Sequence, residues 1–68
     1  MELYDKWVFE IMIENWLTDH PENYDLSIGE PEKDKSGNWI AYAETNKSTY
    51  ILYDRGNGNI ALDYIDTK

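Results

Sequence analysis

The chain has 68 residues, no cysteine, and 14 acidic residues against 6 basic ones, which gives a formal net charge of −8. A chain of this length forms one domain and buries only about 60% of its unfolded surface, so its stability is marginal. The lack of cysteine excludes disulfides and thiolate metal sites. The negative charge disfavours direct contact with nucleic acid or an anionic membrane. It permits high solubility, a basic partner protein, or mimicry of nucleic-acid phosphates.

The start of the chain gives no sign of a signal peptide. Glu10 and Glu14 interrupt its apolar residues, and no basic region precedes them. No run approaches the roughly 20 apolar residues that a membrane-spanning helix needs. With the absence of cysteine, these features predict a cytoplasmic protein.

Residues 2–19 contain neither glycine nor proline and are expected to form a helix. The helix should end before Pro21, whose ring disfavours helical backbone at His20. At 100° per residue, one apolar stripe contains Tyr4, Val8, Ile11, Met12 and Trp16. Further apolar side chains fall beside the charged ones: Leu3, Trp7, Ile13 and Leu17. Either loops cover this surplus, or Ile13 and Leu17 contact a partner or a second copy.

The middle of the chain is polar. Residues 20–23 are expected to turn, and the alternation of Tyr24, Leu26 and Ile28 with polar residues predicts a short strand at a sheet edge. Residues 30–38 are expected to form a charged loop.

The last third of the chain predicts a three-stranded antiparallel meander. Three runs rich in β-branched and aromatic residues are separated by polar turns at 46–47 and 55–58; they are Trp39–Thr45, Ser48–Asp54 and Asn59–Ile65. The predicted fold is α+β, with one domain over residues 1–68. An N-terminal helix packs on an antiparallel sheet of three or four strands.

Pairing through these turns assigns two faces to the sheet. One face carries Ile40, Tyr42, Ile51, Tyr53, Ile60, Leu62 and Tyr64. The other carries Trp39, Ala41, Ala43, Tyr50, Leu52 and Ala61, with Asp63 near its edge. A one-residue change in the first turn would move half of them to the other face.

The helix is expected on the first face, which holds more branched aliphatic side chains. The opposite choice stays open, because Ala41, Ala43 and Ala61 would let a helix approach closely. One helix covers only one face, so aromatic rings stay accessible on the other, which favours self-association or docking of a partner.

No motif predicts catalysis, a metal or a cofactor. Residues 54–60 look like part of an EF-hand loop, but alignment on Gly58 puts Tyr53, Arg55 and Tyr64 where oxygen ligands are needed. The glycines are better explained by a hairpin turn. His20 is the only histidine, so no zinc site can form around it.

The candidate partner-binding site is an acidic segment with aromatic anchors. Its residues are Asp19, Glu22, Tyr24, Asp25, Glu30, Glu32, Asp34 and Trp39. Carboxylates around aromatic rings are what a binder of a basic protein surface presents. The alternative is a solvated loop with scattered charges.

Two resemblances add to this interpretation. Residues 38–65 contain a tryptophan-bearing strand, a tyrosine-bearing strand that ends in Asp54, a glycine turn and then Ile60, and they resemble PepSY-type modules. Those modules are usually exported, whereas this chain shows no signal peptide. In size, charge and compactness the chain also resembles small acidic inhibitors encoded by phages and mobile elements.

The sequence thus predicts a non-enzymatic acidic protein that docks on a basic, nucleic-acid-binding site of a larger protein and blocks it as a DNA mimic. The sharpest version is a phage-type anti-defence inhibitor such as an anti-CRISPR protein. The alternative is a homodimeric structural or regulatory module.

Overall fold

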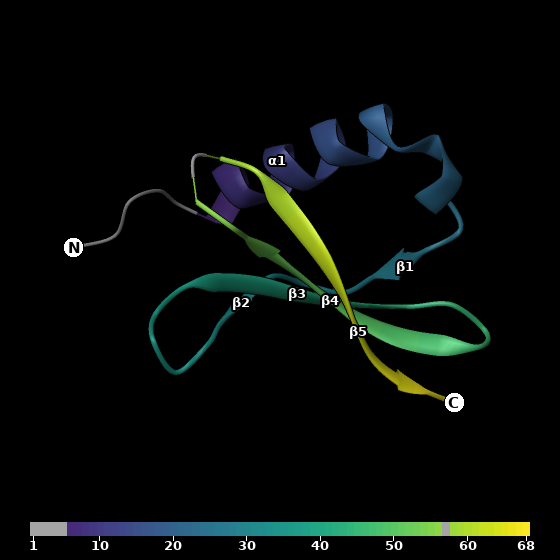
Figure 1. The fold of residues 1–68 in the computed structure, drawn as a ribbon. Coiled ribbons are helices and arrows are strands. Elements are labelled where there is room, and N and C mark those ends of the chain that lie inside the picture. Colours follow the sequence, from purple (N-terminus) through teal and green to yellow (C-terminus); the bar gives the residue numbers. More distant parts are fainter. Residues whose placement is uncertain (1–5, 57) are drawn as a thin grey trace.

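The computed structural model describes residues 6–56 and 58–68 and shows an α+β domain, in which one helix lies on an antiparallel sheet (Figure 1). The elements in chain order are α1 (Lys6–Asp19), the 3-10 turn η1 (Pro21–Asn23), β1 (Ser27–Ile28), β2 (Glu32–Lys33), β3 (Trp39–Glu44), β4 (Ser48–Asp54) and β5 (Ile60–Thr67). The predicted fold class is confirmed, with five strands instead of three or four. Residues 2–5 of the predicted helix lie outside the described residues.

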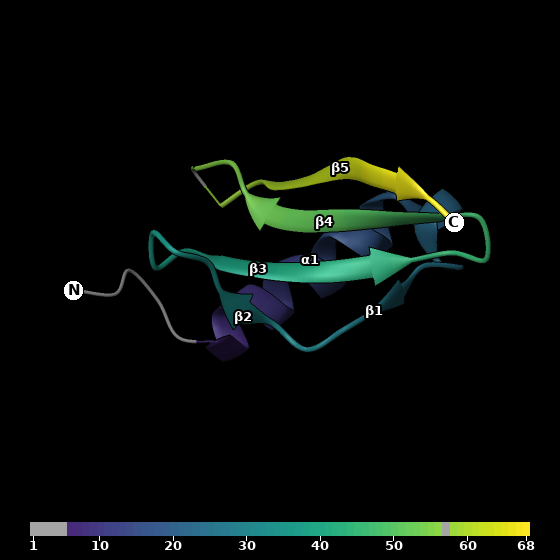
Figure 2. The same ribbon diagram turned by 90° about the horizontal axis from the view of Figure 1, so that it is seen from below.

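The sheet has the strand order β1-β3-β4-β5, and β2 pairs with β3 beside β1 (Figure 2). Ile28 lies opposite Ala43 at one end of β3, and Lys33 lies opposite Trp39 at the other end. The predicted edge strand is therefore confined to two residues, and a second short strand lies in the segment predicted as a loop.

The helix α1 ends at Asp19, as the sequence predicts. The following residue, His20, precedes Pro21 and has a backbone φ of −132° and ψ of 66°, outside the helical region. The chain then makes the single turn η1, in which the Asn23 N–H donates to the His20 carbonyl at 2.9 Å.

The predicted face for the helix is wrong. The core cluster consists of Phe9 and Ile13 from α1 and of Ala41, Ala43 and Leu52 from the sheet. These three sheet residues belong to the face that was left as the alternative. Ala41 and Ala43 leave room for the Phe9 ring, which is fully buried. Close approach to small side chains therefore outweighed the larger number of branched aliphatics on the other face.

The register of β3 and β4 follows the predicted two-residue turn. Tyr42 lies opposite Ile51, and the Thr45 N–H donates to the Ser48 carbonyl at 2.9 Å. The register of β5 differs from the prediction. Asp54 lies opposite Ile60, so five residues connect β4 and β5 instead of four.

This extra residue turns β5 over, because neighbouring side chains on a strand point to opposite faces. Leu62 is paired with Leu52, so Ile60 and Leu62 lie on the helix side of the sheet. Both side chains pack against the core. Ala61 and Asp63 point to the side away from α1 and share it with Tyr42, Ile51 and Tyr53, whereas the prediction grouped them with Ala41, Ala43 and Leu52.

The apolar stripe of α1 also differs from the predicted one. Ile13 is 6% exposed and Leu17 packs against the core, whereas Ile11 is 43% exposed and Trp7 is 59% exposed. The interpretation that Ile13 and Leu17 contact a partner is wrong, since both contribute to the protein's own core. The surplus apolar surface of the helix lies at Trp7 and Ile11.

Candidate partner-binding site

The helix α1 lies on one side of the sheet and leaves the other side uncovered (Figures 1 and 2). Paired residues share a face, and the register therefore groups Ile40, Tyr42, Ile51, Tyr53 and Ala61 on this side. We call this surface the open face. The Tyr42 side chain is 49% exposed, while Ile51 and Tyr53 are half-buried. Ile40 is buried, so the open face offers mainly the Tyr42 ring, with parts of Ile51 and Tyr53 beside it.

Carboxylates border the open face. The same register places Glu32 beside Ile40 and Asp63 beside Ile51, while Glu44 and Asp66 both lie opposite Thr49. All four acidic residues are exposed. Lys68 forms an ion pair with Glu44, with 2.6 Å between Nζ and Oε1. An apolar centre with an acidic border is complementary to a partner surface on which basic residues surround an apolar patch.

Tyr53 is held in place by one of these carboxylates. Its phenol O–H donates to Oδ2 of Asp63 at 2.7 Å. This hydrogen bond raises the pKa of Tyr53 above its ordinary value, and burial and the charge of Asp63 add to the shift, while Arg55 opposes it. The ring is therefore oriented before any partner arrives, which lowers the entropy cost of burying it.

Four of the predicted site residues gather at the C-terminal end of α1. Asp19 is the last helical residue, Glu22 lies in η1, and Tyr24 and Asp25 follow directly. All four are exposed, and the Tyr24 ring is 64% exposed.

The other four predicted site residues lie near the start of α1 and of β3. Glu30 accepts a hydrogen bond from Lys6 at 2.5 Å, and Glu32 lies on the open face. The carboxylate of Asp34 accepts from two backbone N–H groups of its own loop, both at 2.9 Å. Trp39 is half-buried and packs on the core, with the Lys33 ammonium 5.2 Å from its ring centroid.

The structure does not bring these eight residues into one patch. The 14 residues of α1 extend over about 20 Å, and the two groups lie at its two ends (Figure 1). Among them, Asp34 and Trp39 already have roles within the domain.

The sequence analysis expected an uncovered sheet face with aromatic rings, and it grouped Tyr42, Ile51 and Tyr53 together, but it assigned that group to the face under the helix. The signal in the sequence was that the large or charged Tyr42 and Glu44 alternate with the small Ala41 and Ala43, which leaves room for a helix only on the alanine side.

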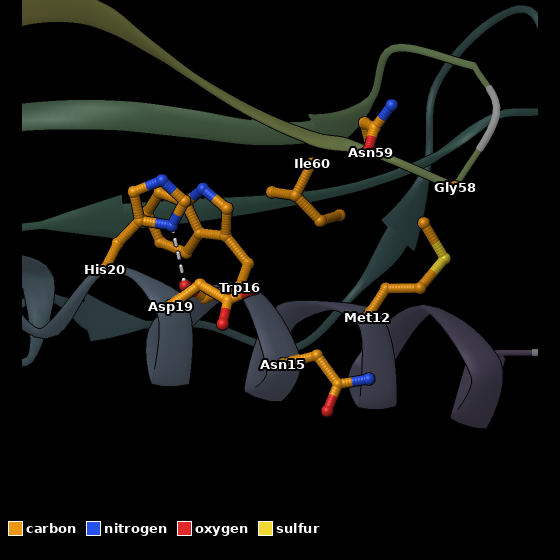
Figure 3. A pocket seen from close by; sticks show the side chains of 8 residues that line it. All are labelled: Met12, Asn15, Trp16, Asp19, His20, Gly58, Asn59 and Ile60. Atoms are coloured by element: carbon orange, nitrogen blue, oxygen red, sulfur yellow. Dashed lines mark hydrogen bonds between the residues drawn. The ribbon is translucent and has the colours of Figure 1, made fainter.

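A second feature is a hollow of about 220 Å³ between α1 and the start of β5 (Figure 3). Met12, Trp16 and Ile60 supply apolar walls, and Asp19 places a carboxylate at the helix end. The Trp16 and His20 rings stack with their centroids 5.2 Å apart, and His20 Nδ1 lies 2.9 Å from the Trp16 carbonyl oxygen. The hollow therefore has a fixed aromatic side and one charged group.

Comparisons with known proteins give no relative, since no protein family, curated protein or solved structure matches the chain. Within residues 6–56 and 58–68, no helix has the length and apolar character to cross a membrane. In the same residues, no three His, Cys, Asp or Glu side chains gather in a way that could hold a metal ion.

Proposed function

We propose that this protein is a non-enzymatic binding protein whose open face docks on a basic, nucleic-acid-binding surface of a larger protein and blocks it. The observation that carries the proposal is the pair of an exposed Tyr42 and a half-buried Tyr53 on the open face, with carboxylates along its border. An inhibitor of this kind, of which phage-type anti-defence proteins are the sharpest version, mimics the charge of nucleic acid. The small size and the net charge of −8 support this version.

The mechanism has two steps. The overall negative charge first steers the chain toward a basic surface and raises the association rate, as complementary fields do. Asp19, Glu22 and Asp25, which are exposed at one end of α1, contribute to this steering. Tyr42 and Tyr53 then become buried against the partner, and aromatic side chains of this kind dominate binding energy.

The test uses the purified chain as bait for proteins of a host lysate, with two charge-matched variants. The first variant, Glu44→Gln with Asp63→Asn, removes two charges from the border of the open face. The control, Glu10→Gln with Glu14→Gln, removes two charges from exposed positions on α1. Double-stranded DNA serves as the competitor.

We expect the wild-type chain and the α1 variant to capture the same protein, and DNA to release it, because both ligands compete for one basic surface. The open-face variant should lose most of the capture at physiological salt. Equal capture by both variants, or a captured protein that DNA does not displace, would refute the proposed function.

A second candidate function is a homodimeric structural or regulatory module. The exposure of Trp7 and Ile11, which lie one helical turn apart on α1, favours it, because together they form an apolar surface outside the core. Sedimentation velocity at two concentrations separates the candidates. A dimer that Trp7→Ser dissociates would support the module, and a monomer at both concentrations would exclude it.

A further inference from the structure

The outer edge of β5 is an unpaired sheet edge. β5 has eight residues and ends the strand order, and no other strand of residues 6–56 and 58–68 pairs with its outer side. At its two ends, the Arg55 N–H donates to the Asn59 carbonyl at 2.8 Å and the Lys68 N–H donates to the Lys47 carbonyl at 2.9 Å. A main chain with free N–H and C=O groups of this kind is a template for another strand.

The alternation of hydrogen bonds identifies which groups point outward. In an antiparallel pair every second residue bonds to its neighbour, and the residues between them bond to the other side. The Arg55 N–H bonds to Asn59, and no register shift lies between Asn59 and Tyr64, so Ile60, Leu62 and Tyr64 direct their N–H and C=O groups away from β4. The outer edge of β5 thus offers these three residues to a partner's main chain.

The charges on β5 decide what can pair there. Asp63 and Asp66 lie on this strand, and Ile65 forms a bulge between them, since Tyr64 lies opposite Tyr50 and Asp66 lies opposite Thr49. Two copies joined edge to edge would bring these carboxylates together, in chains that each carry −8, and like charges across strands destabilise pairing. A strand with lysine or arginine side chains would instead be attracted to these carboxylates, because opposite charges across strands stabilise pairing.

The hollow beside α1 lies at the first end of this edge (Figure 3). Its apolar walls, Met12, Trp16 and Ile60, suit the aliphatic stem of a long basic side chain, and Asp19 suits its charged head. In an added strand, the residue paired with Ile60 would have its side chain on the same face as Ile60, next to this hollow. The edge and the hollow therefore favour the same kind of ligand.

We propose that the outer edge of β5 accepts an extended, arginine- or lysine-bearing segment of the partner as an added strand, with one basic side chain in the hollow beside Trp16 and Asp19. This mode of binding rests on the proposed function and specifies it. Main-chain hydrogen bonds give such a complex its affinity, and alternate side chains give it specificity.

The test uses a short synthetic peptide of arginine and valine whose arginines fall on both faces of the extended chain, and a control peptide with glutamate in place of each arginine. NMR of the backbone amides follows the titration. We expect the arginine peptide to shift the amides of Ile60, Leu62 and Tyr64 and to slow their exchange with solvent, and the glutamate peptide to leave them unchanged.

Two variants at one exposed position separate main-chain pairing from side-chain contact. Tyr64→Pro removes one outward N–H, which edge strands tolerate, whereas Tyr64→Ala removes the ring and keeps the N–H. We expect Tyr64→Pro to weaken binding of the arginine peptide by about tenfold or more, and Tyr64→Ala to weaken it less. Circular dichroism and amide spectra check that both variants are folded.

Several outcomes would overturn the inference. The first is that Tyr64→Pro and Tyr64→Ala weaken binding of the arginine peptide equally, and the second is that the glutamate peptide binds as well as the arginine peptide. The third is that the peptide shifts only amides of the open face, at Tyr42 and Ile51. The fourth is that the amides of β5 shift with rising protein concentration in the absence of peptide, which would indicate pairing between two copies. The third outcome would leave the proposed function standing and remove only the added strand. Failure of the DNA-competed capture described above would instead remove the proposed function itself.

Discussion

The hydrogen bond from Tyr53 to Asp63 links one ring of the open face to one of its border carboxylates. Ionisation of the phenol would break this hydrogen bond, and burial and the nearby charge of Asp63 also disfavour the phenolate, so the pKa of Tyr53 is raised above the ordinary 10.0. We expect Asp63→Asn to lower the pKa of Tyr53 toward that value. A pH titration of the ¹³C signals of the tyrosine rings measures it. Asp66→Asn serves as the control, and an unchanged Tyr53 in Asp63→Asn would contradict the assignment.

The same shift predicts how stability depends on pH. The pKa of Tyr53 is higher in the folded than in the unfolded chain, so the folded chain holds this proton more tightly. The stabilisation is complete below the unfolded pKa and is lost as the pH rises through the folded pKa. We therefore expect the urea midpoint of the wild-type chain to fall more steeply than that of Tyr53→Phe in this alkaline range. Parallel curves for the two chains would exclude the effect.

Ile13 and Ile11 test which side of α1 is buried. They carry the same side chain two residues apart, but Ile13 belongs to the core and Ile11 is largely exposed. We expect Ile13→Val to lower the free energy of unfolding by about 1 kcal/mol, because it deletes a buried methylene. Ile11→Val should have a much smaller effect. Urea denaturation measures both, and equal losses would contradict the packing of α1.

The turn before β5 depends on glycine. Gly58 has a φ of 76°, in the left-handed region, and a Cβ there would meet no atom within 4 Å. We expect Gly58→Ala to destabilise the fold by about 1 kcal/mol through backbone strain alone. Gly29→Ala is the matched control, because its Cβ would only touch the Tyr42 carbonyl oxygen at 3.4 Å and no left-handed φ opposes it. A thermal melt that ranks Gly29→Ala as the more damaging change would contradict this account.

The same turn shows what could be predicted from sequence at the level of elements. The helix end, the turn at 46–47 and the register of β3 with β4 follow from local signals, namely Pro21 and the pattern of alternating residues. The orientation of β5 does not, because an Arg-Gly-Asn-Gly-Asn segment can close a hairpin with four or five residues. That single residue decides whether Leu62 is in the core and Asp63 on the open face.

The choice of the covered face could not be predicted for a different reason. Counting branched aliphatics measures how much area a face can bury, and it favoured the face of Ile40 and Ile51. How closely the helix can approach depends on shape, and Ala41 and Ala43 let the Phe9 ring reach the sheet. The acidic residues were identified as a group by composition, but their division between two ends of α1 depends on the tertiary fold.

At the scale of the whole molecule, repulsion among like charges opposes folding. The chain has 14 acidic and 6 basic residues, and the ion pairs Lys6–Glu30 and Lys68–Glu44 are both at the surface, where such pairs contribute little. The domain is thin, with extents of 37 × 26 × 17 Å, so its carboxylates stay close together. Salt screens this repulsion more than it weakens the few attractive pairs.

We therefore expect the melting temperature to rise when NaCl is increased from about 0.01 M to about 0.15 M, where the screening length falls to roughly 8 Å. The triple variant Asp19→Asn, Glu22→Gln, Asp25→Asn removes three charges from one end of α1 and should flatten this dependence. Lys35→Gln, at an exposed loop position, adds one net negative charge and should steepen it. Differential scanning calorimetry measures all three chains. A melting temperature that falls with salt would mean that attractive ion pairs dominate. The acidic side chains would then stabilise the fold itself, and their charge would need no partner to explain it.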